Sequence, residues 1–174
     1  MNVRTTLTRQ LNVSLSENGM FVEIRRKIGE KKLEDGSVVP IFYDQENDRK
    51  DARVAKLSRD EIILIAESLK AYIEGGVEKF KEFVERSGYG QVNGGIALVF
   101  YHAGKDSEKR ILLSVFRGRN GEKITFGISE KDEEGKWDRE YVIGVDPAVT
   151  KFVFEKAAER IIQKELSGNG RGRS

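Results

Sequence analysis

The stretch "ARVAKLSRDEI", residues 52–62, marks the point where a strand gives way to a helix. Ser58 is a favoured N-cap, because its hydroxyl accepts a hydrogen bond from a free backbone N–H of the first turn. Glu61, three residues later, completes a capping box. The apolar residues that follow recur on one helical face as far as Gly75 and Gly76, so the stretch predicts a helix over 58–76.

A second junction of the same kind is "EYVIGVDPAVT", residues 140–150. Asp146 is the expected N-cap, and Pro147 occupies the first helical position, which proline favours. The helix that follows is expected to run to about residue 166. Its predicted buried stripe is Val149, Phe152, Val153, Ala157, Ile161 and Leu166.

Four strands precede each helix in the predicted fold. They are expected at 10–16, 19–28, 38–44 and 52–57, and again at 95–103, 109–117, 122–130 and 136–144. The fold class is therefore α+β, with tandem ββββα units and two antiparallel four-stranded sheets packed with helices. A single α+β sheet with a similar order of elements is the alternative.

The predicted organisation is a single domain over 1–174, built of two ββββα halves. The first half covers 8–76, and a short helix at 77–86 with a linker fills 77–94. The second half covers 95–166. The tail at 167–174, "SGNGRGRS", is small and polar, so we expect it to be disordered.

The hairpin "SVFRGRNGEKITF", residues 114–126, has Asn120-Gly121 as its expected turn. Side chains of a strand alternate between its two faces. Ile111, Leu113 and Val115 are therefore expected inside, as are Ile124, Phe126 and Ile128. Phe116 and Lys123 are expected on the open face.

Cations and aromatic rings recur on strands in both halves. This mixture is typical of single-stranded nucleic-acid binding, in which phosphates pair with cations and unstacked bases lie on rings. Core packing or simple solvation explains any one of these residues equally well. The candidate binding residues are Arg25, Lys27, Tyr43, Phe116, Arg117, Arg119, Lys123, Trp137 and Arg139.

The composition excludes several kinds of site. The chain has no Cys and a single His, so a thiolate site or a multi-histidine metal site is excluded. The sequence contains no phosphate-binding loop or hydrolase motif, and we expect no enzyme activity, no cofactor and no bound metal. The net charge is only +2, so any basic face must come from segregated charge. The many Lys, Glu, Arg and Ile residues fit a heat-adapted, thermophile source.

The two junctions and the order of elements resemble the Whirly family and, more distantly, the positive cofactor 4 family. In Whirly proteins two ββββα units are joined in one chain that binds single-stranded DNA across its sheets, and some relatives bind RNA. The plant Lys-Gly-Lys-Ala-Ala-Leu motif is absent here, and the helix at 77–86 is extra. The resemblance implies binding residues where basic or aromatic side chains occupy the sheets.

The sequence therefore predicts a non-enzymatic single-stranded DNA-binding protein, largely sequence-independent. It is expected to act in DNA protection and maintenance or in transcription regulation, in the cytoplasm with the nucleoid. No membrane segment is expected, and Phe80 and Phe83 are expected to help build a homo-oligomer. An RNA-binding module of the same build, a protein-interaction scaffold without nucleic acid and a carboxylate metal-dependent nuclease remain as alternatives.

Overall fold

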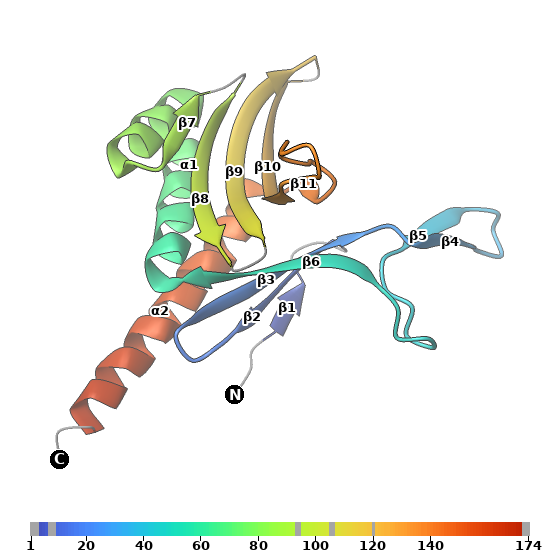
Figure 1. Ribbon diagram of the computed structural model, residues 1–174, viewed down its shortest axis with the longest axis horizontal. Helices are drawn as coiled ribbons and strands as arrows, with labels where there is room; N and C mark the ends of the chain where they lie inside the picture. The colour runs from blue at the N-terminus through green and yellow to red at the C-terminus, as the bar shows by residue number, and fades with distance from the viewer. Residues whose placement is uncertain (1–3, 7–9, 93–94, 105–106, 120, 172–174) are drawn as a thin grey trace.

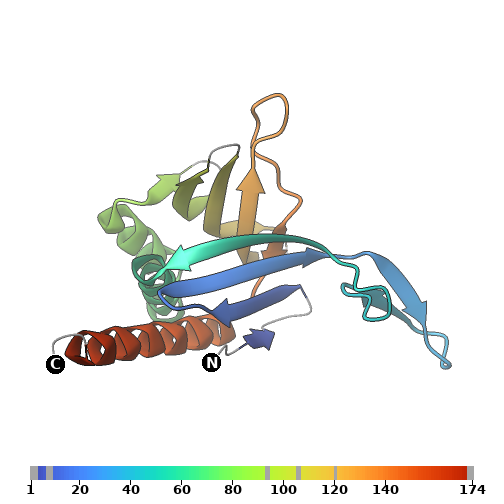
Figure 2. The same cartoon turned by 60° about the horizontal axis from the view of Figure 1, so that its bottom comes forward.

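The computed structural model describes residues 4–6, 10–92, 95–104, 107–119 and 121–171. It is an α+β structure with two antiparallel sheets and two long helices (Figure 1). Figures 1 and 2 show the strands of one sheet running across those of the other, with a two-stranded arm reaching away from both. Among the residues described, no helix is both long and apolar enough to span a lipid bilayer.

The first sheet, called sheet 1 below, contains four strands in the order β1-β2-β3-β6. They are β1 (Arg4–Thr6), β2 (Leu11–Leu15), β3 (Gly19–Arg26) and β6 (Asp51–Ser58), all paired antiparallel. Strand β1 lies before the predicted first half and was not expected. The predicted third strand, 38–44, is not part of this sheet.

That predicted strand forms the arm instead. Strands β4 (Gly29–Lys32) and β5 (Val38–Ile41) pair only with each other, as a separate two-stranded sheet. The reason is compositional, because "GEKKLEDGS" at 29–37 offers no apolar face that a core would hold. The arm is drawn in light blue at the right of Figure 1.

The second sheet, called sheet 2, contains five strands in the order β11-β10-β9-β8-β7. They are β7 (Gly90–Val92), β8 (Ile96–Ala103), β9 (Glu108–Gly118), β10 (Gly121–Glu130) and β11 (Val142–Gly144). Strand β7 lies in the predicted linker, and the predicted strand 136–144 is reduced to its last three residues. The second half therefore has five sheet strands before its helix instead of four, and the exact tandem ββββα arrangement is not confirmed.

The hairpin at 114–126 forms as predicted, with its turn displaced by one residue. Gly118 pairs with Gly121, so the connection is 119–120 and not the expected Asn120-Gly121. Asn120 itself lies outside the described residues. Gly121 has a φ of 104°, a value that glycine adopts readily.

The two predicted helices both form within α1 (Arg59–Ser87), and non-helical backbone at Gly76 separates them where the break was expected. The predicted capping box is confirmed: the Glu61 N–H donates to Ser58 Oγ at 3.3 Å, and the Ser58 N–H donates to Glu61 Oε1 at 2.9 Å. Helix α2 (Pro147–Arg171) begins where expected. It continues past residue 166, so the expected disorder is wrong for 167–171, and 172–174 lie outside the described residues.

One hydrophobic core joins both sheets to both helices. The expected inner faces are confirmed, since Ile111, Leu113 and Val115 of β9 are buried. The same holds for Ile124, Phe126 and Ile128 of β10. Because the helices pack against these faces, the opposite face of sheet 2 remains open.

The predicted stripe of α2 is only partly buried. Ala157 and Ile161 belong to the core, and Val153 is packed against it. Val149, Phe152 and Leu166 are instead 48%, 59% and 68% exposed. The helix is rotated so that Phe154 and Ala158 face the core in their place.

Glu61 makes the stability of the fold depend on pH. Burial alone raises the pKa of its carboxyl, but hydrogen bonds from His102 and from the Ser58 backbone outweigh burial and hold the pKa below its usual 4.5. His102 Nε2 lies 2.8 Å from Glu61 Oε2. A carboxyl whose pKa is lowered by folding contributes stability above its unfolded pKa, and this is lost as pH falls through the folded pKa.

We therefore expect the free energy of unfolding, measured by urea titration, to decrease as the pH falls below 4.5. Glu61→Gln is expected to make that decrease shallower, because the variant has no proton to take up at this site. A variant whose stability follows the same pH profile as the unmodified protein would contradict this role of Glu61.

Candidate nucleic-acid interface

The open face of sheet 2 forms a groove of about 920 Å³. It is called the outer groove below. Strand alternation directs Ser114, Phe116 and Lys123 away from the helices, and strand pairing aligns such side chains in rows across β8, β9 and β10. Arg117 and Glu122 have the alternate, helix-side orientation and border the groove only at its hairpin end, where Glu122 bonds to Tyr72 of α1. The groove is lined by Gln91, Gly95, Ala97, Val99, Arg110, Leu112, Ser114, Phe116, Arg117, Glu122, Lys123, Ile124, Thr125, Arg139, Val142, Gly144, Val145 and Pro147, with Tyr72 from α1.

The floor of the outer groove is small and mostly apolar. Ala97 lies opposite Ser114, and Ser114 lies opposite Thr125. A Cβ added to Gly127 on β10 would lie 2.7 Å from Val142 Cγ2, so glycine lets Val142 of β11 approach the sheet closely. Beside its hydrocarbon, the floor presents the hydroxyl groups of Ser114 and Thr125.

Aromatic rings stand at both ends of the outer groove. Phe116, which pairs with Lys123 across the hairpin, is 38% exposed. At the other end Tyr101 is 56% exposed, and its ring centroid lies 6.0 Å from that of Trp137. The Gln91 side chain donates a hydrogen bond to the Tyr101 hydroxyl. These rings offer flat apolar surface to a ligand.

The cations of this region have few carboxylate partners. In the part of the chain that the structure describes, Arg110, Lys123 and Arg139 have no carboxylate oxygen within 4.0 Å, and the same is true of Arg119 in the hairpin connection. Arg117 has only Glu122, at 3.9 Å. The Arg110 guanidinium instead lies over the Trp137 ring, 4.8 Å from its centroid.

Most cations on and beside sheet 1, in contrast, have carboxylate partners. Lys56 of β6 is an exception among the described residues, since it lies over the 41% exposed Phe21 ring, 5.7 Å from its centroid. Arg25 Nε lies 2.6 Å from Glu23 Oε1, and Lys50 Nζ lies 2.6 Å from Glu23 Oε2. Burial raises the pKa of Glu23, but the hydrogen bonds from Lys50 and Arg25 lower it more, so the carboxylate form is favoured. Lys27 is paired with Glu30.

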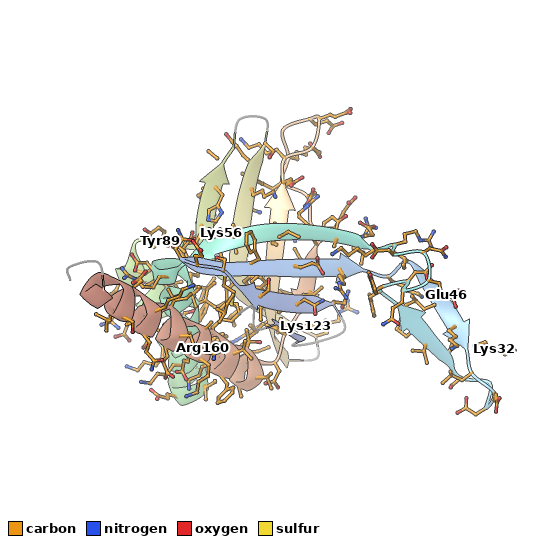
Figure 3. The ribbon with its side chains drawn as sticks, turned by 90° about the horizontal axis from the view of Figure 1, so that it is seen from below. Lys32, Glu46, Lys56, Tyr89, Lys123 and Arg160 are labelled. Atoms are coloured by element: carbon orange, nitrogen blue, oxygen red, sulfur yellow. The ribbon has the colours of Figure 1, made fainter. Side chains whose placement is uncertain are left out.

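The structure separates the predicted binding residues into two groups. Phe116, Arg117, Lys123 and Arg139 line the outer groove, Trp137 contacts its Arg110, and Arg119 lies exposed in the hairpin connection. Arg25, Lys27 and Tyr43 lie elsewhere, on β3 and beside the arm. The Arg25 guanidinium is 5.2 Å from the Tyr43 ring centroid, and the Tyr43 hydroxyl bonds to Asp48. Figure 3 shows Lys32 and Glu46 on the arm, far from Lys123.

Sequence reasoning missed Tyr101 and Arg110 as members of the site. Tyr101 lies in "IALVFYHA" at 96–103, where apolar residues fill both strand faces and hide the alternation. Tyr101 on β8 pairs with Arg110 on β9, and this pairing identifies both residues as members of the site. The register of the two strands is known only from the structure.

A carboxylate closes the hairpin end of the outer groove. Glu122 Oε2 accepts a hydrogen bond from the Tyr72 hydroxyl at 2.7 Å, while its Oε1 lies 3.9 Å from Arg117 Nε. The hydrogen bond to Glu122 raises the pKa of Tyr72. Among the described residues, no group of three or more His, Asp or Glu side chains is placed to hold a metal ion.

Comparisons with known proteins give fold likenesses only. No protein-family model and no curated protein matches the chain. The solved structure of WHY3 from Arabidopsis thaliana is similar over 95% of each chain, with 14% identity and a TM-score of 0.40. That of WHY1 from the same plant covers 92% of this chain and 89% of its own, with 12% identity and a TM-score of 0.38.

A third similar structure is the plant transcriptional regulator PBF-2, which covers 98% of this chain and 87% of its own. Its identity is 14% and its TM-score 0.39. All three are Whirly proteins, the family that the order of elements predicted. Likenesses this distant carry no conclusion about what the chain binds.

Proposed function

We propose that this chain is a single-stranded DNA-binding protein and that the DNA lies in the outer groove of sheet 2. The observation that carries the proposal is the set of cations without carboxylate partners beside exposed rings. Phosphates supply the missing negative charge for Arg110, Lys123 and Arg139. Bases stack on Phe116 and Tyr101, an interaction worth about 1–3 kcal/mol per base.

The placement of the helices supports a single strand over a duplex. Readers of duplex DNA commonly insert a helix into the major groove. Here α1 and α2 supply core residues such as Ile65 and Phe154, and the floor of the outer groove consists of strands. A duplex also keeps its bases stacked on one another, so the exposed rings have no partner in it.

The chemistry of the floor supports binding with little sequence preference. Ala97 and Leu112, both partly exposed, offer hydrocarbon to any base, and stacking on a ring tolerates every base. Such a protein is suited to coating exposed DNA, either to protect and maintain it or to regulate transcription, with no enzymatic step. The proposed location is therefore the nucleoid.

The proposal includes self-association, through a different surface from the one expected. Phe80 is completely buried in the core, so it is not available as a contact, whereas Phe83 is partly exposed. The outward side of α2 instead exposes Phe152, Ile162 and Leu166, a pattern typical of a surface covered by another protein. Sedimentation equilibrium at several concentrations measures this directly, and a strictly monomeric protein would contradict it.

The test of DNA binding removes two cations from the outer groove. Arg117→Ala combined with Lys123→Ala is expected to weaken binding of a labelled single-stranded oligonucleotide about tenfold, because exposed charge contacts contribute up to about 1 kcal/mol each. The loss is expected to be similar for all sequences. The slope of log affinity against log salt is expected to shrink by about 1.4, since each phosphate contact contributes about 0.7.

Matched variants control for net charge. Lys31→Ala combined with Lys32→Ala removes the same charge from the exposed arm and is expected to leave affinity nearly unchanged. Glu122→Gln is expected to raise affinity, because it removes the carboxylate that faces Arg117. Equal losses from the groove and arm pairs would reject the site. Tighter binding of duplex DNA would reject the proposal, and tighter binding of a matched RNA strand would favour the RNA-binding alternative.

A further inference from the structure

Two side chains at the outer groove come from an irregular loop. Residues 131–141 connect β10 to β11 and were predicted to be mostly strand. Asp132 folds the loop tip by accepting hydrogen bonds from the N–H groups of Glu134 and Lys136, both at 2.9 Å. Trp137 then lies against Arg110, and Arg139 lines the groove. Backbone contacts hold the stem of this loop, because the Asp138 N–H donates to the Glu130 carbonyl at 3.0 Å and Lys131 forms a bridge with Trp137. Side chains of the loop add an anchor outside it.

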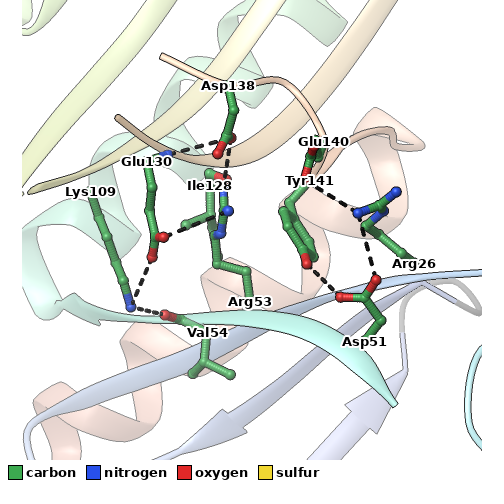
Figure 4. Close-up of polar contacts among 10 residues, drawn as sticks. All are labelled: Arg26, Asp51, Arg53, Val54, Lys109, Ile128, Glu130, Asp138, Glu140 and Tyr141. Atoms are coloured by element: carbon green, nitrogen blue, oxygen red, sulfur yellow. Dashed lines mark hydrogen bonds and ion pairs between the residues drawn. The ribbon is translucent and has the colours of Figure 1, made fainter. Parts of the chain in front are cut away.

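The anchor comes from sheet 1, through the residues that alternate with the groove residues. Arg53 Nη1 lies 2.7 Å from Asp138 Oδ1, and Arg26 Nη1 lies 3.3 Å from Glu140 Oε2 (Figure 4). Trp137 contacts Arg110 and Arg139 lines the groove, while Asp138 and Glu140 reach across to sheet 1. Tyr141 reaches sheet 1 as well, since its hydroxyl donates to Asp51.

The contact between Arg53 and Asp138 is the most enclosed of these anchors. Their side chains are 13% and 20% exposed, whereas those of Arg26 and Glu140 are 44% and 59% exposed. Arg53 Nη1 also donates to the Ile128 carbonyl at 3.0 Å, and its guanidinium lies 4.1 Å from the Tyr141 ring centroid. Exposed pairs contribute little, so Arg53 with Asp138 is the ion pair that fixes the loop, beside the hydrogen bond from the buried Tyr141 hydroxyl to Asp51.

We propose that Arg53 and Asp138 are positioning residues for nucleic-acid binding. They hold Trp137 and Arg139 at the outer groove without touching the ligand. The inference rests on the proposed function. It means that a residue of β6, in sheet 1, affects how tightly DNA binds to sheet 2. Breaking the pair lets the loop move, so Trp137 and Arg139 meet the DNA less often.

The variant Asp138→Asn tests this assignment. It removes one negative charge, and on charge alone it strengthens binding of a polyanion. A positioning role predicts the opposite effect, a decrease in affinity for a single-stranded oligonucleotide of between about two- and thirtyfold. This is the usual range for residues that influence binding without touching the ligand. The fold survives the change, because Glu130 Oε2, 3.6 Å from Arg53 Nη2, still faces the guanidinium.

The fluorescence of Trp137, the only tryptophan of the chain, reports the position of the loop. In Asp138→Asn its emission is expected to shift to longer wavelength, and its quenching by acrylamide is expected to increase. Glu134→Gln is the matched control, because it removes the same charge from the same loop, at a side chain that is 78% exposed and does not contact sheet 1. This control is expected to keep both the emission and the affinity.

The outcomes separate the inference from the proposed function. If the Asp138→Asn variant binds the oligonucleotide as tightly as the unmodified protein, the positioning role is wrong and the proposed DNA binding still stands. Weaker binding with unchanged Trp137 emission also overturns it, because the loop has then not moved. An unmodified protein that binds no single-stranded DNA overturns the proposed function together with the claim about affinity. The emission shift then decides alone whether Asp138 holds the loop.

Discussion

Sheet 2 has one open face because the helices and the core pack against only the other face. Ile111, Leu113 and Phe126 join a core shared with both helices, so nothing from the described chain remains to cover the opposite side. Strand alternation then determines which residues meet a ligand. The outer groove, the rings at its ends and the position of its cations all depend on this division of the sheet into a closed and an open face.

Charge pairing distinguishes the two sheets more clearly than composition does. The net charge of +2 gives no sign of a nucleic-acid partner. At sheet 1, Glu23 pairs with both Arg25 and Lys50, and Lys56 is a described cation there that has only a ring contact. On sheet 2, no carboxylate of the described chain lies within 4.0 Å of Lys123. A polyanion gains little binding free energy from cations that already have a carboxylate partner. It gains more from cations that have none. The irregular loop beside the groove joins the two sheets, since Arg53 of sheet 1 holds Asp138.

Local signals predicted much of this structure. The capping box at Ser58 and the inner faces of β9 and β10 follow from short-range rules, and so does the hairpin. The strands that make up sheet 1 were not predictable. Strands β4 and β5 could pair with that sheet or with each other, and residues distant in the sequence decide between the two. Trp137 and Arg139 were placed on a strand that is mostly loop. The spacing of Glu23 and Arg25, two residues apart on one strand face, was a local signal that they neutralise each other.

Hydrogen–deuterium exchange with and without a single-stranded oligonucleotide tests the central claim most directly. The account predicts slower exchange in 95–104, 107–119, 121–130 and 137–144, the described segments around the outer groove, and no change in the arm at 29–41 or in α2. Slower exchange over the arm and the outer face of sheet 1, with sheet 2 unchanged, would contradict it. In that case the paired cations would be the ones that bind, and the unpaired cations of sheet 2 would serve only to solvate the surface.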